Sequence, residues 1–190
     1  MPIAPEELRT LGNLALLDLL KTAFFCSRQY PAAVEQPTYR WALEQRTQGH
    51  CIVSGFHSML EQTVFRYLLQ GPEQPIVYAL GRGIQPNLHL EYGLEIEAGH
   101  LLFVTPFEPE IQTVTQETAD IRNLLIADMA DQFFVPYAAP DGNLDRLLRH
   151  ATAQGKTILT LDIAENQALL ARGAQPFQPT GIMGLHKQQL

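Results

Sequence analysis

The chain lacks several features that would assign it to a class of protein at once. Its 190 residues include two cysteines, Cys26 and Cys51, and neither has a second cysteine at metal-binding spacing. Both lie in apolar stretches that we expect to form core strands, so buried, reduced thiols are predicted.

The longest apolar runs are far shorter than the ~20 residues that span a bilayer. The N-terminus also lacks the basic and apolar regions of a signal peptide. We therefore expect a cytoplasmic protein with no membrane partner.

Positive charge is also scarce. The chain has 13 Lys and Arg against 20 Asp and Glu, which gives a net charge of −7, and no run of basic residues occurs. Proteins that bind long nucleic acids by neutralising phosphates usually carry a basic patch. Any nucleic-acid site must therefore be local, built from a few arginines and backbone amides. A small nucleotide suits this charge balance better than a long polyanion.

Three catalytic or nucleotide-binding motifs are absent. No G-x-G-x-x-G follows the first expected strand, which argues against an NAD site, and no G-x-x-x-x-G-K-[ST] indicates a P-loop phosphotransferase. Ser54 precedes Gly55, but Ile52 stands where a nucleophile elbow requires glycine. A serine hydrolase is therefore not expected.

The most informative stretch runs from His50 to Leu69. A short β-branched run fits a buried strand, Ser54-Gly55 breaks it, and apolar residues then recur at helical spacing. The expected buried stripe of this helix is Met59, Leu60, Val64, Tyr67 and Leu68. A strand, tight turn and helix in this order aim backbone N–H groups at an anion above the sheet, with Glu61 in the first helical turn. The alternative is an ordinary strand-to-helix turn without a ligand.

Strands and helices alternate along the whole chain. We expect strands at residues 21–27, 51–53, 75–80, 101–107, 133–139 and 156–162. We expect helices at residues 3–20, 38–48, 59–69, within 87–99, at 117–131, 144–154 and 166–171. This alternation predicts an α/β protein with a three-layer, Rossmann-like fold, in which helices cover both faces of a mostly parallel sheet. An N-terminal helix over residues 1–20, a Rossmann-like domain over 21–175 and a tail over 176–190 are the expected divisions.

Four polar or glycine-rich turns follow strands of this sheet, at residues 27–31, 54–58, 81–84 and 140–143. The carboxyl ends of parallel strands meet at one edge, and ligands of such sheets bind there, near the point where strand order reverses. These turns therefore predict a binding site at that edge.

Each candidate side chain has an ordinary structural alternative. Gly81-Arg82-Gly83 is also typical of a turn that needs positive φ. Arg122 lies on an expected helix, where most arginines are on the surface. His57 fits a general base or a metal ligand, but no Cys, His or Asp lies at metal spacing, so a hydrogen-bonding turn residue is favoured. No metal, cofactor or catalytic residue is assigned.

These residues together resemble the Rossmann-like domain of the DNA-processing protein A family (DprA, also called Smf). The family's G-S-R turn is similar to Cys26-Ser27-Arg28, and its S-G-x-A-x-G-I-D turn is similar to Ser54-Gly55 running to Glu61. Gly81-Arg82-Gly83-Ile84 matches a later turn, the family's R-N-R-x-I helix matches Arg122-Asn123 onward, and its S-G-S-L turn matches Asp141-Gly142-Asn143-Leu144. The chain differs from these patterns at Cys26, Met59, Glu61 and Leu124, and Leu124 removes one expected phosphate contact.

The resemblance implies a set of residues that bind phosphate or DNA. They are Ser27, Arg28, Ser54, Gly55, Phe56, His57, Ser58, Glu61, Gly81, Arg82, Gly83, Arg122, Asn123, Asp141 and Gly142.

The resemblance also implies a function. DprA proteins bind single-stranded DNA, form dimers and load a recombinase, so it implies a DNA-binding or nucleotide-binding homodimer that acts in DNA processing. The wider superfamily includes nucleotide sensors and phosphoribohydrolases, but the P-G-G-x-G-T-x-x-E signature of the latter is absent. The alternatives are a nucleotide-acting, hydrolase-type enzyme with Glu61 or His57 as acid or base, a nucleotide sensor, or a partner protein without a ligand.

Overall fold

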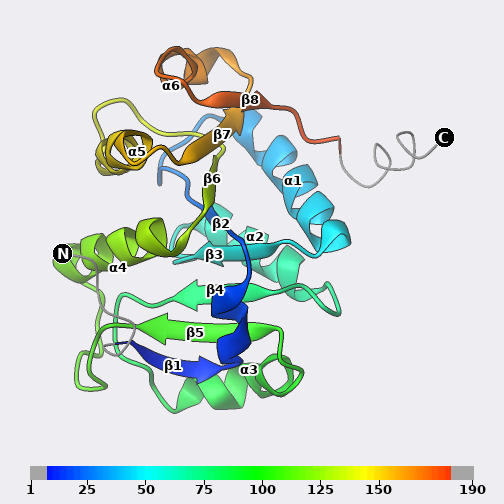
Figure 1. The fold of residues 1–190 in the computed structure, drawn as a ribbon, viewed down its shortest axis with the longest axis vertical. Helices are drawn as coiled ribbons and strands as arrows, with labels where there is room; N and C mark the ends of the chain where they lie inside the picture. Colours follow the sequence, from blue (N-terminus) through cyan, green and yellow to red (C-terminus); the bar gives the residue numbers. More distant parts are fainter. Residues whose placement is uncertain (1–7, 181–190) are drawn as a thin grey trace.

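An eight-stranded sheet in the order β1-β5-β4-β3-β2-β6-β7-β8 forms the centre of the molecule (Figure 1). The computed structural model describes residues 8–180. Every pair of neighbouring strands is parallel except β1 and β5, which are antiparallel. The strands are β1 Arg9–Gly12, β2 Lys21–Phe24, β3 Cys51–Ser54, β4 Ile76–Ala79, β5 Leu101–Thr105, β6 Gln132–Val135, β7 Thr157–Leu161 and β8 Gln175–Phe177.

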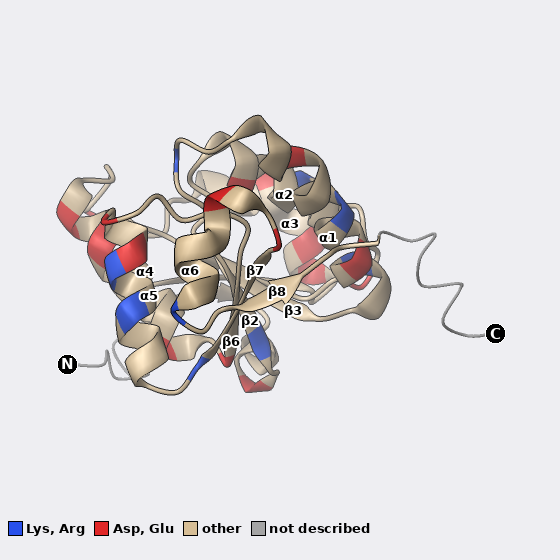
Figure 2. Ribbon diagram, turned by 90° about the horizontal axis from the view of Figure 1, so that it is seen from above, with Lys and Arg blue, Asp and Glu red and all other residues tan. Residues whose placement is uncertain are grey.

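Helices cover both faces of this sheet (Figure 2), with α1, α2 and α3 on one side and α4 and α5 on the other. The helices are α1 Glu35–Gln48, α2 Met59–Leu69, α3 Asn87–Glu97, α4 Gln116–Met129, α5 Asn143–Ala153 and α6 Gln167–Ala171. Short 3₁₀ helices occur at Leu14–Asp18, Ala32–Val34 and Ala164–Asn166. The predicted α/β, Rossmann-like fold with a mostly parallel sheet is confirmed.

The core has two halves because successive strand residues point to opposite faces. In β3, Ile52 packs into the cluster that includes Trp41 of α1 and Leu60 of α2, whereas Val53 packs into the cluster that includes Ile126 of α4. All four residues of β2 and all four of β3 are buried. Met59 departs from the expected buried stripe of α2, because its side chain is 83% exposed. It is the first residue of that helix, beyond the edge of the core.

The N-terminal segment differs from the expected helix over residues 3–20. Within its described part, the chain forms strand β1 and then a 3₁₀ helix at Leu14–Asp18. Gly12, the last residue of β1, has a φ of 121°, and a Cβ there would lie 2.3 Å from the Leu101 carbonyl oxygen. Glycine is therefore required where β1 ends beside the first residue of β5. The Asn13 side chain then accepts from the Ala15 N–H at 3.1 Å and donates to the Gly99 carbonyl at 2.8 Å. The expectation for residues 3–7 lies outside the described residues.

The C-terminal segment contains strand β8, which the sequence did not predict. It pairs in parallel with β7 and forms the edge of the sheet. Pro176 is tolerated there because an edge strand has no neighbouring strand on its outer side, so an N–H donor is not needed on that side. Phe177 packs against Phe134, with ring centroids 5.9 Å apart. Thr180 donates hydrogen bonds to the buried carboxylate of Glu44 on α1. Residues 181–190 of the expected tail lie outside the described part of the chain.

Strand order reverses next to β2. From β2 the chain passes through α1 to β3 and continues outward to β4 and β5, and it then returns through α4 to β6 on the other side of β2. The connection after β2, through α1, covers one face of the sheet, and the connection after β5, through α4, covers the other face. Because these two connections separate at this point, a crevice opens beyond the carboxyl ends of β2 and β6. No helix within residues 8–180 is long and apolar enough to cross a membrane.

Candidate functional site

A cavity of about 240 Å³ lies at this reversal of strand order. It is enclosed by the turn after β2, the turn after β3, the first half of α4 and the start of α5. Its lining residues are Phe25, Cys26, Ser27, Arg28, His57, Ser58, Glu61, Gln116, Ala119, Asp120, Arg122, Asn123, Asn143 and Leu144. We refer to it as the switch-point cavity.

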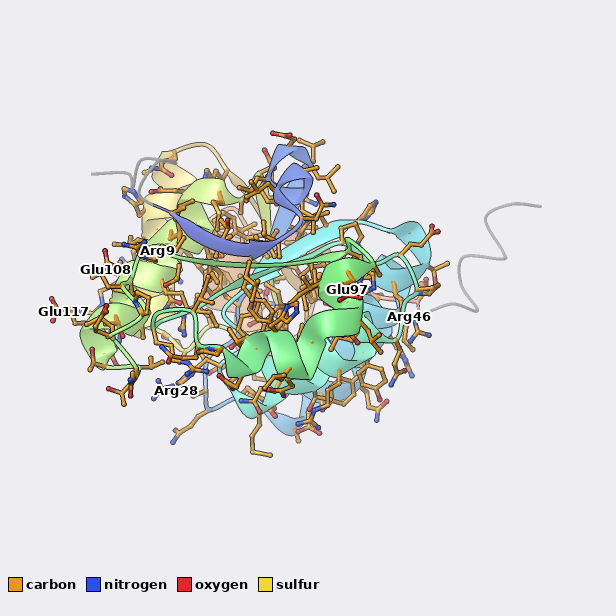
Figure 3. The ribbon with its side chains drawn as sticks, turned by 90° about the horizontal axis from the view of Figure 1, so that it is seen from below. Arg9, Arg28, Arg46, Glu97, Glu108 and Glu117 are labelled. Carbon is orange, nitrogen blue, oxygen red and sulfur yellow. The ribbon has the colours of Figure 1, made fainter. Side chains whose placement is uncertain are left out.

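The turn after β2 contributes Ser27 and Arg28. The Ser27 hydroxyl accepts a hydrogen bond from the Ala139 N–H at 2.8 Å, and the Ser27 N–H donates to the Tyr137 carbonyl at 3.1 Å. Ser27 thereby fixes this turn to the one after β6. Arg28 is exposed at the mouth of the cavity, on the side where the parallel strands end, whereas Arg46 lies on the opposite side (Figure 3).

The turn after β3 begins with Ser54, which has a structural role. Its hydroxyl donates to the Phe24 carbonyl at 2.7 Å and accepts from the Phe56 N–H at 3.2 Å, and the residue is completely buried. Phe56, with a φ of 42°, is also buried, and its ring lies 4.8 Å from that of Phe65. Neither Ser54 nor Phe56 lines the switch-point cavity, although both were expected to bind ligand.

Glu61 connects two of the turns. Its carboxylate accepts hydrogen bonds from three backbone N–H groups, those of Cys26 at 3.3 Å, His57 at 2.7 Å and Ser58 at 3.0 Å. Ser58 in return accepts from the Glu61 N–H, which completes a capping box at the start of α2. The α2 N-terminus was expected to hold an external anion, but the Glu61 carboxylate already satisfies these donors.

Arg122 is the buried cation of the site, since the residue is only 6% exposed. Its Nε and one terminal nitrogen donate to the Asn123 side-chain oxygen at 3.2 and 3.0 Å. Ion pairs occur at several places within residues 8–180, but none of them includes Arg122. Burial lowers the pKa of its guanidinium, while the nearby Glu61 carboxylate acts in the opposite direction. The guanidinium still stays charged, because arginine does not lose its proton in proteins.

Two glycines make room for this guanidinium. A Cβ on Gly55 would lie 2.6 Å from Arg122 Nε, and a Cβ on Gly81 would lie 3.4 Å from one of its terminal nitrogens. Gly83 is required for a different reason, because its Cβ would lie 2.1 Å from the Glu108 carbonyl oxygen. Neither Gly81 nor Gly83 has positive φ, so close packing explains these glycines and the expected turn conformation does not.

Arg82 lines a second cavity of about 240 Å³ on the other side of Arg122, between the turn after β4 and helix α3. Aromatic residues form much of its wall, including Tyr78 and Tyr92, while His57 and Arg122 line both cavities. The Arg82 carbonyl accepts from the Thr105 hydroxyl at 2.7 Å, which fixes the turn to the end of β5.

Asp141 and Gly142 do not line the switch-point cavity. Asp141 has a φ of 58° and forms an exposed ion pair with Arg149 at 3.3 Å. The Gly142 N–H donates to the Ala139 carbonyl at 3.2 Å, and the residue precedes the first turn of α5. The next two residues, Asn143 and Leu144, reach the cavity instead.

The structure therefore brings together Ser27, Arg28, His57, Ser58, Glu61, Arg122 and Asn123 from the expected set. Lining residues that were not expected are Phe25, Cys26, Gln116, Ala119, Asp120, Asn143 and Leu144. Gln116 and Asp120 lie one turn apart on α4, the element that carries Arg122, and spacing along that helix is the signal that would have identified them. Burial raises the pKa of the Cys26 thiol far above its ordinary value, so this cysteine is a poor nucleophile.

The chain is similar to known proteins in fold and in family. It matches the family model of DNA recombination-mediator protein A over residues 1–180. It is similar to DNA processing protein A from Helicobacter pylori, whose structure is described as giving insight into a unique single-stranded DNA binding mode. That match has 22% identity and a TM-score of 0.76, and it covers 100% of this chain and 89% of that chain.

It is also similar to the DNA processing protein A of Streptococcus pneumoniae, with 19% identity and a TM-score of 0.75, over 90% of this chain and 62% of that chain. This chain therefore spans less than two thirds of the streptococcal protein. A molybdenum cofactor binding protein from Rippkaea orientalis matches with 12% identity and a TM-score of 0.59, over 90% of this chain and 97% of that chain. Identities this low show the fold alone. A search of curated proteins finds no match. Because the family model covers nearly the whole sequence, the chain belongs to the DNA recombination-mediator protein A family.

Proposed function

We propose that this protein binds single-stranded DNA and that the switch-point cavity holds one phosphate of the strand. The observation that carries this proposal is the buried guanidinium of Arg122, which makes no ion pair among the described residues. A buried charge without an ion-pair partner is costly, and a bound anion would offset much of that cost. The planar guanidinium also matches a phosphate in geometry, because two parallel N–H groups can donate to two oxygens.

The neighbouring residues support an anionic ligand. Arg28 stands at the mouth of the cavity, and Asn123 and Asn143 supply polar side chains on its wall. Family membership supports DNA as the source of the phosphate, as does the similarity to the H. pylori protein that is described with single-stranded DNA. The site is small and local, as expected for a chain with a net charge of −7.

A nucleotide-acting enzyme is the alternative, and the geometry of Glu61 does not favour it. Both carboxylate oxygens of Glu61 accept backbone N–H groups, which leaves this side chain fixed as a structural link. A general base must reach a substrate proton, and a carboxylate with three backbone donors is poorly placed for that role.

Family membership also supports three further proposals. We propose that residues 21–175 act as the binding domain, that the protein forms a homodimer in the cytoplasm, and that a recombinase is its partner on DNA. Light scattering on the purified chain tests the dimer, and co-sedimentation with a recombinase on single-stranded DNA tests the partner.

Titration of a fluorescein-labelled oligo-dT tests the proposed function, with free nucleotides as competitors. We expect Arg122→Gln to weaken binding by about 1.5–3 kcal/mol, or roughly 10- to 150-fold in Kd, because it removes a charge-assisted contact. Arg28→Gln is the second variant, since it is exposed and should leave folding intact. Arg66→Gln is the matched control, an exposed arginine on α2 that lines none of these cavities. If folded Arg122→Gln and Arg28→Gln both bind like the unmodified chain, the proposed site is wrong.

A further inference from the structure

His57 lies where three hollows of the surface meet. It lines the switch-point cavity, the second cavity beside Arg82, and an open hollow next to Tyr30 and Met59. The residue is exposed, and its backbone N–H donates a hydrogen bond to the Glu61 carboxylate at 2.7 Å. The hydrogen bonds that His57 makes with residues between 8 and 180 involve its backbone, and no ion pair among these residues includes its ring. The ring is therefore positioned by its backbone and free to contact a ligand from any of the three hollows.

Charged groups from every element around these hollows share them with His57. They are Arg28 from the turn after β2, Arg122 and Asp120 from α4, Glu61 from α2, Arg82 from the turn after β4, Glu91 from α3 and Glu35 from α1. Several of the acids are already engaged. Glu61 accepts backbone N–H groups, Asp120 accepts from Gln116 at 2.8 Å, and Glu35 accepts from Tyr30 at 3.1 Å. The two arginines on either side of the switch-point cavity, Arg28 and Arg122, have no ion pair among the described residues.

This arrangement disfavours protonation of the ring before ligand binds. Although the residue is exposed, partial desolvation of the ring lowers the pKa of His57 below its ordinary value of 6.5. Arg122 and Arg28 lower it further, and Glu61 acts in the opposite direction. A phosphate between the two arginines would neutralise the repulsion and attract a third positive charge. Anion binding and protonation of the ring should therefore favour each other.

We propose that His57 is a proton-linked ligand of the bound phosphate, which joins Arg28 and Arg122 in its protonated form so that DNA binds with uptake of a proton. This inference rests on the proposed function, because it requires an anion in the switch-point cavity. It assigns to the site a pH dependence, with tighter binding at mildly acidic pH.

The direction of the effect follows from linkage. If the pKa of His57 is higher in the complex than in the free protein, binding is weakest well above the bound pKa. It then strengthens as the pH falls toward the free value. Each unit of difference between the two pKa values corresponds to about tenfold in affinity. The full factor is reached only below the free pKa, so between pH 8 and pH 6 we expect the Kd for oligo-dT to fall severalfold at constant ionic strength.

The test compares the unmodified chain with His57→Asn and with His89→Asn. His89 is an exposed histidine on α3 that lines none of the three hollows, so it controls for the loss of a surface imidazole. Binding by His57→Asn should change little between pH 8 and pH 6, whatever its affinity at pH 8. His89→Asn should keep the full pH dependence. Calorimetry in two buffers of different ionisation enthalpy should detect proton uptake in every protein except His57→Asn.

The outcomes separate this inference from the proposed function. If His57→Asn keeps the pH dependence and the proton uptake while Arg122→Gln loses binding, His57 is not the linked group although the anion site stands. If folded Arg122→Gln and Arg28→Gln both bind normally, the site itself is wrong. NMR titration of the His57 ring with and without oligo-dT gives a direct measurement, and an unchanged pKa in the complex would overturn the inference.

Discussion

At the scale of single residues, the site depends on the space left around Arg122. Gly55 and Gly81 border its guanidinium, and a Cβ on Gly55 would lie within 2.6 Å of Nε, far closer than van der Waals contact allows. The side chain is held by packing and has little room to withdraw. We therefore regard Gly55 as a residue that positions the buried cation.

Gly55→Ala should displace the Arg122 guanidinium and weaken oligo-dT binding by about tenfold or more, equivalent to the ~1.5 kcal/mol of a charge-assisted hydrogen bond. Fluorescence anisotropy titration measures this change. Gly93→Ala on α3 is the matched control, because a Cβ there meets nothing within 4 Å and alanine suits a helix. Equal affinities for the two variants would show that the position of Arg122 does not depend on Gly55.

The sequence identified several residues of the cavity but not their roles. Ser27, Arg28 and Arg122 could be placed near one edge because each lies in or beside a recognisable motif. The burial of Arg122 could not be read from the sequence, because it depends on Gly55, a distant residue of another element. Likewise, the three backbone donors of Glu61 come from two separate turns, so its structural role became visible only once these turns were placed together.

At the scale of elements, one buried carboxylate joins α5 to the segment after α6. The Asp145 side chain is 1% exposed, and it forms ion pairs with Arg149 at 3.1 Å and with Arg172. Hydrogen bonds from Arg172 and Arg149 hold the pKa of Asp145 below its ordinary value of 3.8, against the effect of burial. This carboxylate should therefore stabilise the edge of the sheet formed by β7 and β8.

Asp145→Asn should lower the free energy of unfolding at pH 7 by about 1.5–3 kcal/mol, since it removes charge-assisted hydrogen bonds from Arg149 and Arg172 to a buried carboxylate. In a chain of this length that corresponds to roughly 3–12 °C in Tm. Because the folded pKa is depressed, the stabilisation is present above about pH 4 and is lost as the pH falls through the folded value. Thermal unfolding from pH 7 to pH 3 should therefore show the difference between the two proteins shrinking below pH 4.

Asp162→Asn is the control for this change, because Asp162 is exposed and should alter Tm little. If Asp145→Asn unfolds at the same temperature as this control, the two ion pairs contribute nothing measurable.

Secondary structure could be predicted wherever the pattern was local. Strands β2 to β7 and helices α1 to α5 lie within a few residues of their expected bounds, because buried apolar runs, helical periodicity and turn residues mark them directly. Strands β1 and β8 were missed because both are short edge strands whose formation depends on distant partners, β5 and β7. The leucine spacing near the N-terminus is also typical of a helix, which led to the wrong prediction there. In the structure, Leu8 and Leu11 pack on opposite faces of the sheet.

At the scale of the whole molecule, the charge distribution limits how DNA can be held. Positive and negative residues are interspersed on α1 and α5 (Figure 2), and the chain carries a net charge of −7. A long basic track is absent from the described residues, so DNA should contact few cations. The arginines that face the two cavities are Arg28, Arg82 and Arg122.

The salt dependence of binding should therefore be shallow. For single strands, the logarithm of the binding constant falls with the logarithm of the salt concentration by about 0.7 for each neutralised phosphate. One phosphate between Arg28 and Arg122 and a second at Arg82 predict a slope of about −1.4. Oligo-dT titrations across a series of salt concentrations measure this slope, and Arg82→Gln should reduce its magnitude by about 0.7. A slope near −5 would require cations far from the two cavities, and the DNA would then follow a path over the surface that the switch-point cavity alone does not define.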